Sequence, residues 1–145
     1  MEQSVEAMSA IPARMNEAWN RGDATAFFAD FAEDAVFADW EGTIHRGREQ
    51  MIATHQPIFD TVVKGSRLVH GEVLFARIVQ PGCGVVHHRM GMVMPGEEEP
   101  LPTRYSMQLH VMAWQNDRWE VTALQNSRVL SLDNAMALDS LAATK

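Results

Sequence analysis

The residue best suited to acid–base chemistry is His55. It lies between Ile52 and Phe59 on one face of an expected helix, and this face is expected to look into the interior of the protein. Because an imidazole titrates near neutral pH, it can give or take a proton under physiological conditions. The alternative is a buried, hydrogen-bonded histidine that supports the core.

Asp39 is the second candidate for proton transfer. It ends a short expected strand and is followed by Trp40. A carboxylate beside an indole in a cleft can have a raised pKa and act as a general base. The alternative is a solvated aspartate that stands before a turn at Glu41 and Gly42.

One face of a later expected strand combines polar and aromatic side chains, as the wall of a ligand pocket does. The alternative is an outward face, or one that is paired with a second subunit. Asn126 is an amide in an otherwise apolar strand, so its burial would require hydrogen-bond partners. Met90, Met92 and Met94 share a strand face that could fill the core or form a soft pocket wall. We predict His55 and Asp39 as catalytic residues, and we expect substrate contacts from Trp40, Phe59, Met90, Gln108, His110, Met112, Trp114 and Asn126.

The sequence predicts neither a metal nor a cofactor. No two histidines are spaced four apart on an expected helix or two apart on an expected strand, and His87 and His88 point to opposite faces. The only pair of glycines whose spacing resembles a dinucleotide-binding motif flanks Cys83. A strand is expected after this pair, whereas the dinucleotide-binding motif requires a helix there. Cys83 is the single cysteine, so an internal disulfide is excluded.

The elements that must position these side chains are helices first and strands afterwards. Three- and four-residue spacings predict a helix from Val5 to Trp19 that contains Pro12, which could kink it or start a second piece. Further helices are expected over 24–31 and 48–62, with a short strand over 34–39 between them.

Four long strands joined by tight turns follow, over 67–79, 83–94, 103–114 and 118–129. The tail over 130–145 is expected to form a weak helix from about Asp133. This order predicts an α+β fold, with three helices on a strongly curved, mainly antiparallel sheet that encloses a pocket. In such a cone the helical layer, the first strand and the long strands can bring their polar residues together only at the cavity.

Length, composition and net charge limit the classes of protein to which this chain can belong. The chain has 145 residues, which is the size of one domain on a prior of roughly 100–200 residues each. Its 46% hydrophobic and 21% charged residues are typical of a globular protein. The net charge of −7 argues against nucleic acid and anionic membranes as partners. Apolar runs long enough for a membrane span and features of a signal peptide are lacking, so a cytoplasmic location is expected.

Several segments between about 19 and 129 resemble motifs of the NTF2-like superfamily, in the same order. They are AWNRGD at 18–23, FAEDAVF at 31–37, GREQMI at 47–52, HQPIF at 55–59, KGSRL at 64–68, RWEV at 118–121 and QNSRV at 125–129. Together they resemble the SgcJ/EcaC-type subgroup, which has a SnoaL-like cone fold and includes small proteins of enediyne-antibiotic clusters. The resemblance implies a single NTF2-like domain over 1–145 that pairs as a homodimer through the sheet.

We therefore predict a cofactor-independent tailoring protein of secondary metabolism. It would act on a hydrophobic polyketide- or enediyne-type intermediate by general acid–base chemistry, as an isomerase, cyclase or hydratase. Amides in the pocket would hold a substrate oxygen while His55 or Asp39 moves the proton. The alternative is a protein that binds and protects a reactive polyene without converting it.

Overall fold

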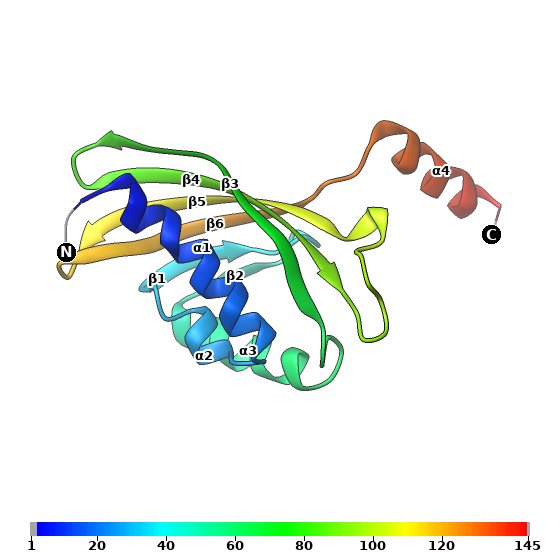
Figure 1. The fold of residues 1–145 in the computed structure, drawn as a ribbon, viewed down its shortest axis with the longest axis horizontal. Coiled ribbons are helices and arrows are strands. Elements are labelled where there is room, and N and C mark those ends of the chain that lie inside the picture. The colour runs from blue at the N-terminus through cyan, green and yellow to red at the C-terminus, as the bar shows by residue number, and fades with distance from the viewer. Residues whose placement is uncertain (1–2, 145) are drawn as a thin grey trace.

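The computed structural model describes residues 3–144, which form four α-helices, one short 3₁₀-helix and a sheet of six strands (Figure 1). The strand order is β2-β1-β6-β5-β4-β3; β1 runs parallel to β6, and the other neighbours are antiparallel. The elements follow in the order α1 (Val5–Asn20), α2 (Ala24–Phe27), β1 (Phe31–Ala38), β2 (Ile44–Arg46), α3 (Arg48–Asp60), β3 (Arg67–Gln80), β4 (Cys83–Val93), η1 (Pro102–Arg104), β5 (Tyr105–Gln115), β6 (Arg118–Arg128) and α4 (Leu132–Ala143). The expected α+β cone with a curved, mainly antiparallel sheet is confirmed.

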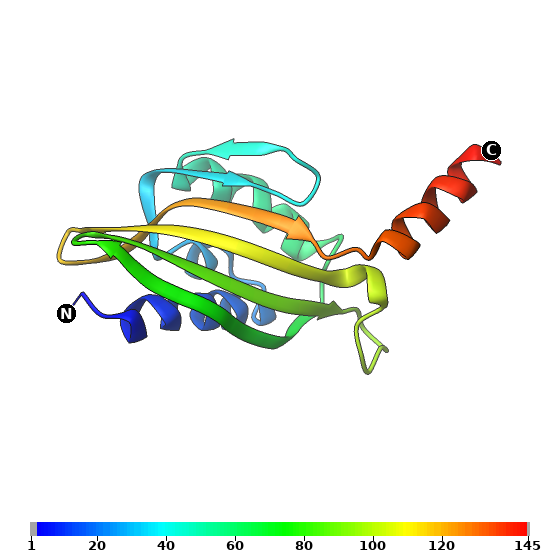
Figure 2. The ribbon, with the colours of Figure 1, turned by 90° about the horizontal axis from the view of Figure 1, so that it is seen from above.

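The helices α1 and α3 cover the inner face of this sheet. Helix α1 packs against β3 and β4, and α3 packs against β1 and β2. The view from above shows the sheet arching over these helices (Figure 2). The core lies between the two layers and includes Met8, Met15, Phe28, Phe31 and Trp119, each at most 2% exposed.

Local sequence signals explain where the first helices begin and end. Ser4 caps α1 by accepting a hydrogen bond from the backbone of Ala7 at 3.1 Å. Gly22 adopts a φ of +70°, which a side-chain-bearing residue rarely tolerates and which turns the chain between α1 and α2. Asp23 then caps α2 through Ala26 at 3.0 Å. Pro12 lies inside α1, which continues unbroken through it.

The structure differs from the expected elements in two places. The second helix ends at Phe27, and Phe31 already begins β1 because its buried side chain joins the sheet. The short strand β2 was missed; it pairs with β1 in the register Phe37 opposite His45. The helix expected from about Asp133 is confirmed as α4, which begins at Leu132 and projects away from the domain beyond the end of β6 (Figure 2).

The helices of residues 3–144 include none that is both long and apolar enough to cross a membrane.

Candidate functional site

A cavity of about 560 Å³ lies between α3 and the inner face of the sheet. Its walls are mainly apolar, with polar groups grouped on the strands and a histidine on the helix. The residues that line it are Trp19, Phe27, Phe37, Asp39, Trp40, Glu41, His55, Ile58, Phe59, Val62, Val63, Leu68, Met90, Met92, Met94, Arg104, Ser106, Gln108, Asn126 and Arg128. A pocket of this size and composition is suited to a small apolar molecule that carries a few polar groups.

His55 stands in the helical wall of this cavity, as predicted. Its Nδ1–H donates to the Met51 carbonyl one turn earlier, at 2.7 Å. The neutral ring therefore bears its lone pair on Nε2, and within residues 3–144 that atom makes no hydrogen bond. Aromatic rings of Phe28 and Phe37 pack on the imidazole at centroid distances of 4.9 and 5.5 Å.

Burial is the main influence on the pKa of His55. It lowers the pKa below the usual 6.5, and the bond to Met51 only partly offsets this effect. The imidazole is consequently neutral at pH 7 and able to accept a proton at Nε2. The charge of Asp39 favours the protonated form, but His45 lowers the pKa of His55 by more than Asp39 raises it.

Asp39 forms a hydrogen-bonded pair with His45, which the sequence analysis did not identify. The Nε2–H of His45 donates to Asp39 Oδ2 at 2.9 Å, while Oδ1 accepts from the backbones of Glu41 and Thr43 at 2.9 and 3.0 Å. Burial raises the pKa of Asp39, but these donors outweigh it and leave the pKa below its ordinary value. The predicted rise in the pKa of Asp39 is therefore wrong. The side chain is an ionised carboxylate, and its pKa is not raised toward neutral pH as that of a general base would be.

The pair of Asp39 and His45 lies against His55. The rings of His45 and His55 have centroids 5.1 Å apart, and Phe37 stacks on His45 at 5.6 Å. The register of β1 and β2 explains this arrangement, since Phe37 faces His45 across the hairpin. The sequence contained one signal for His45. The expected turn at Glu41 and Gly42 could have been interpreted as a hairpin, which would bring a residue near position 45 back beside Asp39.

Two amides form the polar part of the sheet wall. Gln108 on β5 and Asn126 on β6 are cross-strand partners, so their side chains lie next to each other on the inner face. Gln108 is 4% exposed. The Oδ1 of Asn126 is buried and has no hydrogen-bond partner within residues 3–144.

Three predicted contact residues lie on the expected face but outside this cavity. His110 and Met112 are fully buried in the core beneath α1, and Trp114 packs edge-on against Trp119 at 5.5 Å. The alternation along β5 identified the inner face correctly. However, only Gln108 among these four positions reaches the cavity, because the helices fill the narrow end of the cone. Trp40, Phe59, Met90 and Asn126 do line it.

The core histidines should make stability depend on pH. Burial lowers the pKa of His110 from 6.5 to about 3, so the unfolded chain binds a proton that the folded protein excludes. Stability is therefore full above pH 6.5 and is lost as the pH falls. We expect the free energy of unfolding to drop by about 2 kcal/mol from this residue between its ordinary pKa of 6.5 and pH 5.

Urea denaturation at pH 5, 6 and 7 measures this effect. The variant His110→Phe should show a shallower pH dependence than the wild type, whereas His70→Gln, which alters a half-exposed histidine, should not. An equal pH slope in all three proteins would contradict the assignment.

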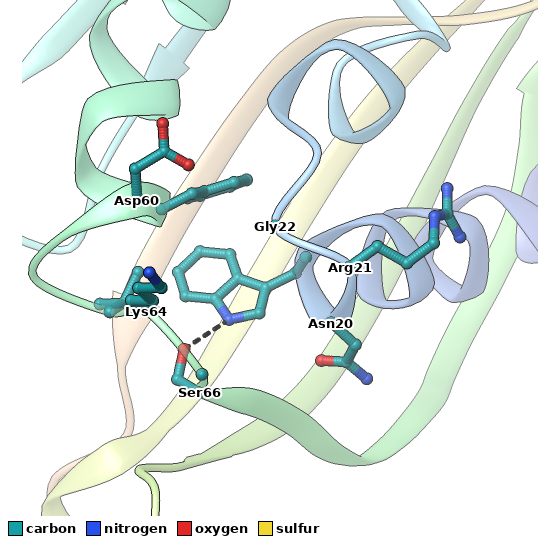
Figure 3. Close-up of a pocket in the computed structure, with 10 residues that line it drawn as sticks. Asn20, Arg21, Gly22, Asp60, Lys64 and Ser66 are labelled. Atoms are coloured by element: carbon teal, nitrogen blue, oxygen red, sulfur yellow. Dashed lines mark hydrogen bonds between the residues drawn. The ribbon is translucent and has the colours of Figure 1, made fainter.

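A second hollow of about 410 Å³ lies where α1 ends beside the loop before β3 (Figure 3). It shares the side chains of Trp19, Phe59 and Val63 with the larger cavity. The indole N–H of Trp19 donates to Ser66 Oγ at 3.0 Å, which closes the boundary between the two spaces.

The same corner gives a physical reason for the segments at 18–23 and 64–68. Asn20 Oδ1 accepts from the Leu68 backbone at 2.7 Å, and its amide donates back to the Leu68 carbonyl at 3.3 Å. These bonds, with the one from Trp19 to Ser66, hold the end of α1 to the start of β3. The motif residues there are structural ties, and they fix the helical layer above the cavity.

Several of the same side chains are of types that can bind a metal ion. Within the part of the chain that the structure describes, no group of three or more histidine, cysteine, aspartate or glutamate residues is placed to hold a metal ion. Asp39 and His45 engage each other, and His55 donates its Nδ1 proton to the backbone.

Comparisons with known proteins agree with this architecture. The model of the SnoaL-like domain family matches residues 13–121. A domain of unknown function with a cystatin-like fold from Nostoc punctiforme is 37% identical, with a TM-score of 0.90 over 99% of this chain and 88% of that chain. No curated protein matches the sequence significantly.

Two more distant structures share the fold. A ketosteroid isomerase-like protein from Erwinia carotovora has a TM-score of 0.71 and 14% identity over 90% of this chain and all 100% of its own. A protein provisionally assigned as a scytalone dehydratase, from Novosphingobium aromaticivorans, also gives 0.71 and 14% over 86% of this chain and 83% of its own.

Proposed function

The chain belongs to the SnoaL-like domain family, and from this premise we propose that it is a cofactor-independent catalyst of proton transfer on an apolar small molecule held in the main cavity. The observation that carries the proposal is His55, whose unpartnered Nε2 lies in an apolar cavity beside the ionised Asp39 and its hydrogen-bonded partner His45. Names of two structures with the same fold, ketosteroid isomerase-like and scytalone dehydratase, are in line with isomerisation or dehydration.

The proposed step begins with neutral His55. Its Nε2 removes a proton from a substrate carbon and becomes an imidazolium, while the electron pair left behind moves onto a substrate oxygen or expels a hydroxyl group. The Asp39 carboxylate favours the positive charge, while the neighbouring His45 opposes it. His55 then returns the proton to another substrate carbon, which is isomerisation, or to the departing hydroxyl, which is dehydration.

In more detail, we propose that the substrate is a polyketide- or enediyne-type intermediate of secondary metabolism and that the reaction takes place in the cytoplasm. Support comes from the apolar side chains Met90, Met92, Met94 and Phe59, which can adapt to an extended unsaturated molecule. The rival function, binding without conversion, rests on the same apolar walls.

One experiment separates the two functions. The gene is deleted in its host, the accumulated metabolite is identified, and that compound is added to purified protein. A catalyst converts it to a new product at a rate that depends on His55. If the compound binds and is recovered unchanged, the binding function replaces the catalytic one.

We also propose that the protein is a homodimer that pairs through the outer face of the sheet. On β5 the residues between the buried ones, including Leu109 and Val111, face outward. Val111 pairs with Val85 on β4, and Leu109 pairs with His87, which in turn pairs with Phe75 on β3. Phe75 is 48% exposed. An apolar surface of this kind usually marks an interface.

Sedimentation at micromolar concentration is expected to give twice the chain mass. The variant Leu109→Arg should give the monomer mass, because it places a charge in the middle of the apolar surface. Glu33→Arg, an exposed change outside that surface, should remain dimeric. A monomeric wild type refutes the proposal.

A further inference from the structure

His110 contacts the Gln108 amide from the core side, and His88 lies directly opposite Gln108 on β4. The side chains of His110 and Gln108 are buried and lie 3.2 Å apart, from His110 Nε2 to Gln108 Oε1. An amide oxygen only accepts hydrogen bonds, so the imidazole Nε2–H is the donor. The Gln108 oxygen is thereby held toward the core, and its NH₂ group is turned away from His110.

His110 is a suitable anchor because it stays neutral. Its pKa of about 3 keeps a single proton on the ring at physiological pH, and that proton sits on Nε2 toward Gln108. The other ring nitrogen, Nδ1, is buried and has no partner within residues 3–144. The contact with Gln108 is thus the one polar interaction that the structure gives this imidazole.

Asn126 lies beside Gln108 and carries a buried acceptor without a partner among the described residues. The two residues are direct partners in the register of β5 and β6, and both line the cavity. Directly opposed side chains of an antiparallel pair have Cβ atoms about 4.5–5.5 Å apart. The Asn126 Oδ1 is buried, unpartnered within the described chain, and an obligate acceptor.

We propose that Gln108 and Asn126 form a donor–acceptor pair that selects a ligand with two neighbouring oxygen functions, a carbonyl and a hydroxyl, and that His110 is the positioning residue that sets this polarity. The Gln108 NH₂ donates to the carbonyl oxygen, and the ligand hydroxyl donates to Asn126 Oδ1. This inference rests on the proposed function, since it assigns the substrate of the same cavity to the class of apolar hydroxy-ketones.

The physical basis of the selection is the cost of an unpaired buried group. A ligand that lacks the hydroxyl leaves Asn126 Oδ1 desolvated without a partner, and one that lacks the carbonyl does the same to the Gln108 amide. Each such loss costs about 1–3 kcal/mol, which corresponds to a loss of affinity of roughly 5- to 150-fold.

Three probes on one ring skeleton test the selection: 3-hydroxy-1-indanone, 1-indanone and 1-indanol. Their binding to the full chain is followed by tryptophan fluorescence, because Trp19 and Trp40 line the cavity. We expect 3-hydroxy-1-indanone to bind about tenfold more tightly than either single-oxygen probe. In Asn126→Leu the advantage over 1-indanone should disappear, and in Gln108→Leu the advantage over 1-indanol should disappear.

A double-mutant cycle tests the positioning role of His110. The variant His110→Phe retains an aromatic ring but removes the N–H, so the amide is free to rotate and the advantage over 1-indanol should fall below twofold. In a Gln108→Leu background the same change should have no further effect on that ratio. A merely structural role of His110 would lower the affinity for all three probes together, in either background.

Each outcome is decisive for the inference. Equal affinities for the three probes, or no binding of any of them, overturn the donor–acceptor assignment. An unchanged probe ratio in His110→Phe overturns the positioning role. Because these measurements record binding and not turnover, they are separate from the dependence of activity on His55, which decides the proposed function.

Discussion

The variant His55→Gln is expected to lose about 10²–10⁴-fold in turnover, the range typical for removal of a general acid–base residue. Glutamine keeps a polar side chain of similar reach but cannot take a proton at neutral pH. The fold and the proposed dimer should remain, because the polar contacts of His55 within the described chain, to the Met51 carbonyl and Thr54 Oγ1, are both within its own helix. The activity is measured by complementation of a deletion strain and by conversion of the accumulated metabolite.

Two further variants serve as a second test of the acid–base function and as a control. Asp39→Asn removes the negative charge that favours protonated His55, so it should also reduce turnover, whereas His70→Gln alters a half-exposed histidine away from the cavity and should not. Full complementation by both His55→Gln and Asp39→Asn would contradict the acid–base function and support binding alone. Unfolding of His55→Gln would assign the residue to the core.

The second large effect is on stability. Replacing Phe28 by alanine is expected to reduce the free energy of unfolding by about 3–5 kcal/mol, as for other buried phenylalanines. Phe28 is fully buried and packs edge-on against Phe27 and Phe31 at 4.8 and 5.0 Å, so its loss leaves a cavity bounded by rings that cannot easily collapse. It also touches His55, at 4.9 Å.

Urea denaturation at pH 7 gives this difference directly. Val62→Ala is the matched control, because Val62 is 72% exposed and its truncation should change the stability by less than about 0.5 kcal/mol. If Phe28→Ala lowers the free energy of unfolding no more than the control does, the aromatic cluster does not stabilise the core.

The order of elements could be predicted because each type left a clear periodic signal. The apolar spacing of α1 and the Gly22–Asp23 stop fixed the first turn of the chain, and the alternation along β4, β5 and β6 fixed the sheet. Strand β2 could not be found in this way, since it has three residues and its side chains are partly or fully exposed. A strand that short carries no measurable alternation.

The site was harder to predict than the fold. Alternation shows on which face a residue lies but not how far along the cone, so His110, Met112 and Trp114 could not be distinguished from Gln108. The sign of the Asp39 pKa shift depends on a turn whose backbone N–H groups converge on the carboxylate, a three-dimensional detail that leaves no pattern in the sequence.

The parallel pairing of β1 with β6 has a consequence for how the protein folds. Strand β1 lies near the start of the chain, and its partner is the last strand of the sheet, with Ala38 beside Gln125. Contacts so distant in sequence close late, because the entropy of a long loop must be overcome first. During synthesis the hairpin of β1 and β2 and the hairpins of β3 to β5 can form before β6 is available to pair with β1. Asp39, just after the end of β1, and Asn126 on β6 therefore come to line one cavity only in the last folding step, so the cavity is complete only in chains that have completed the sheet.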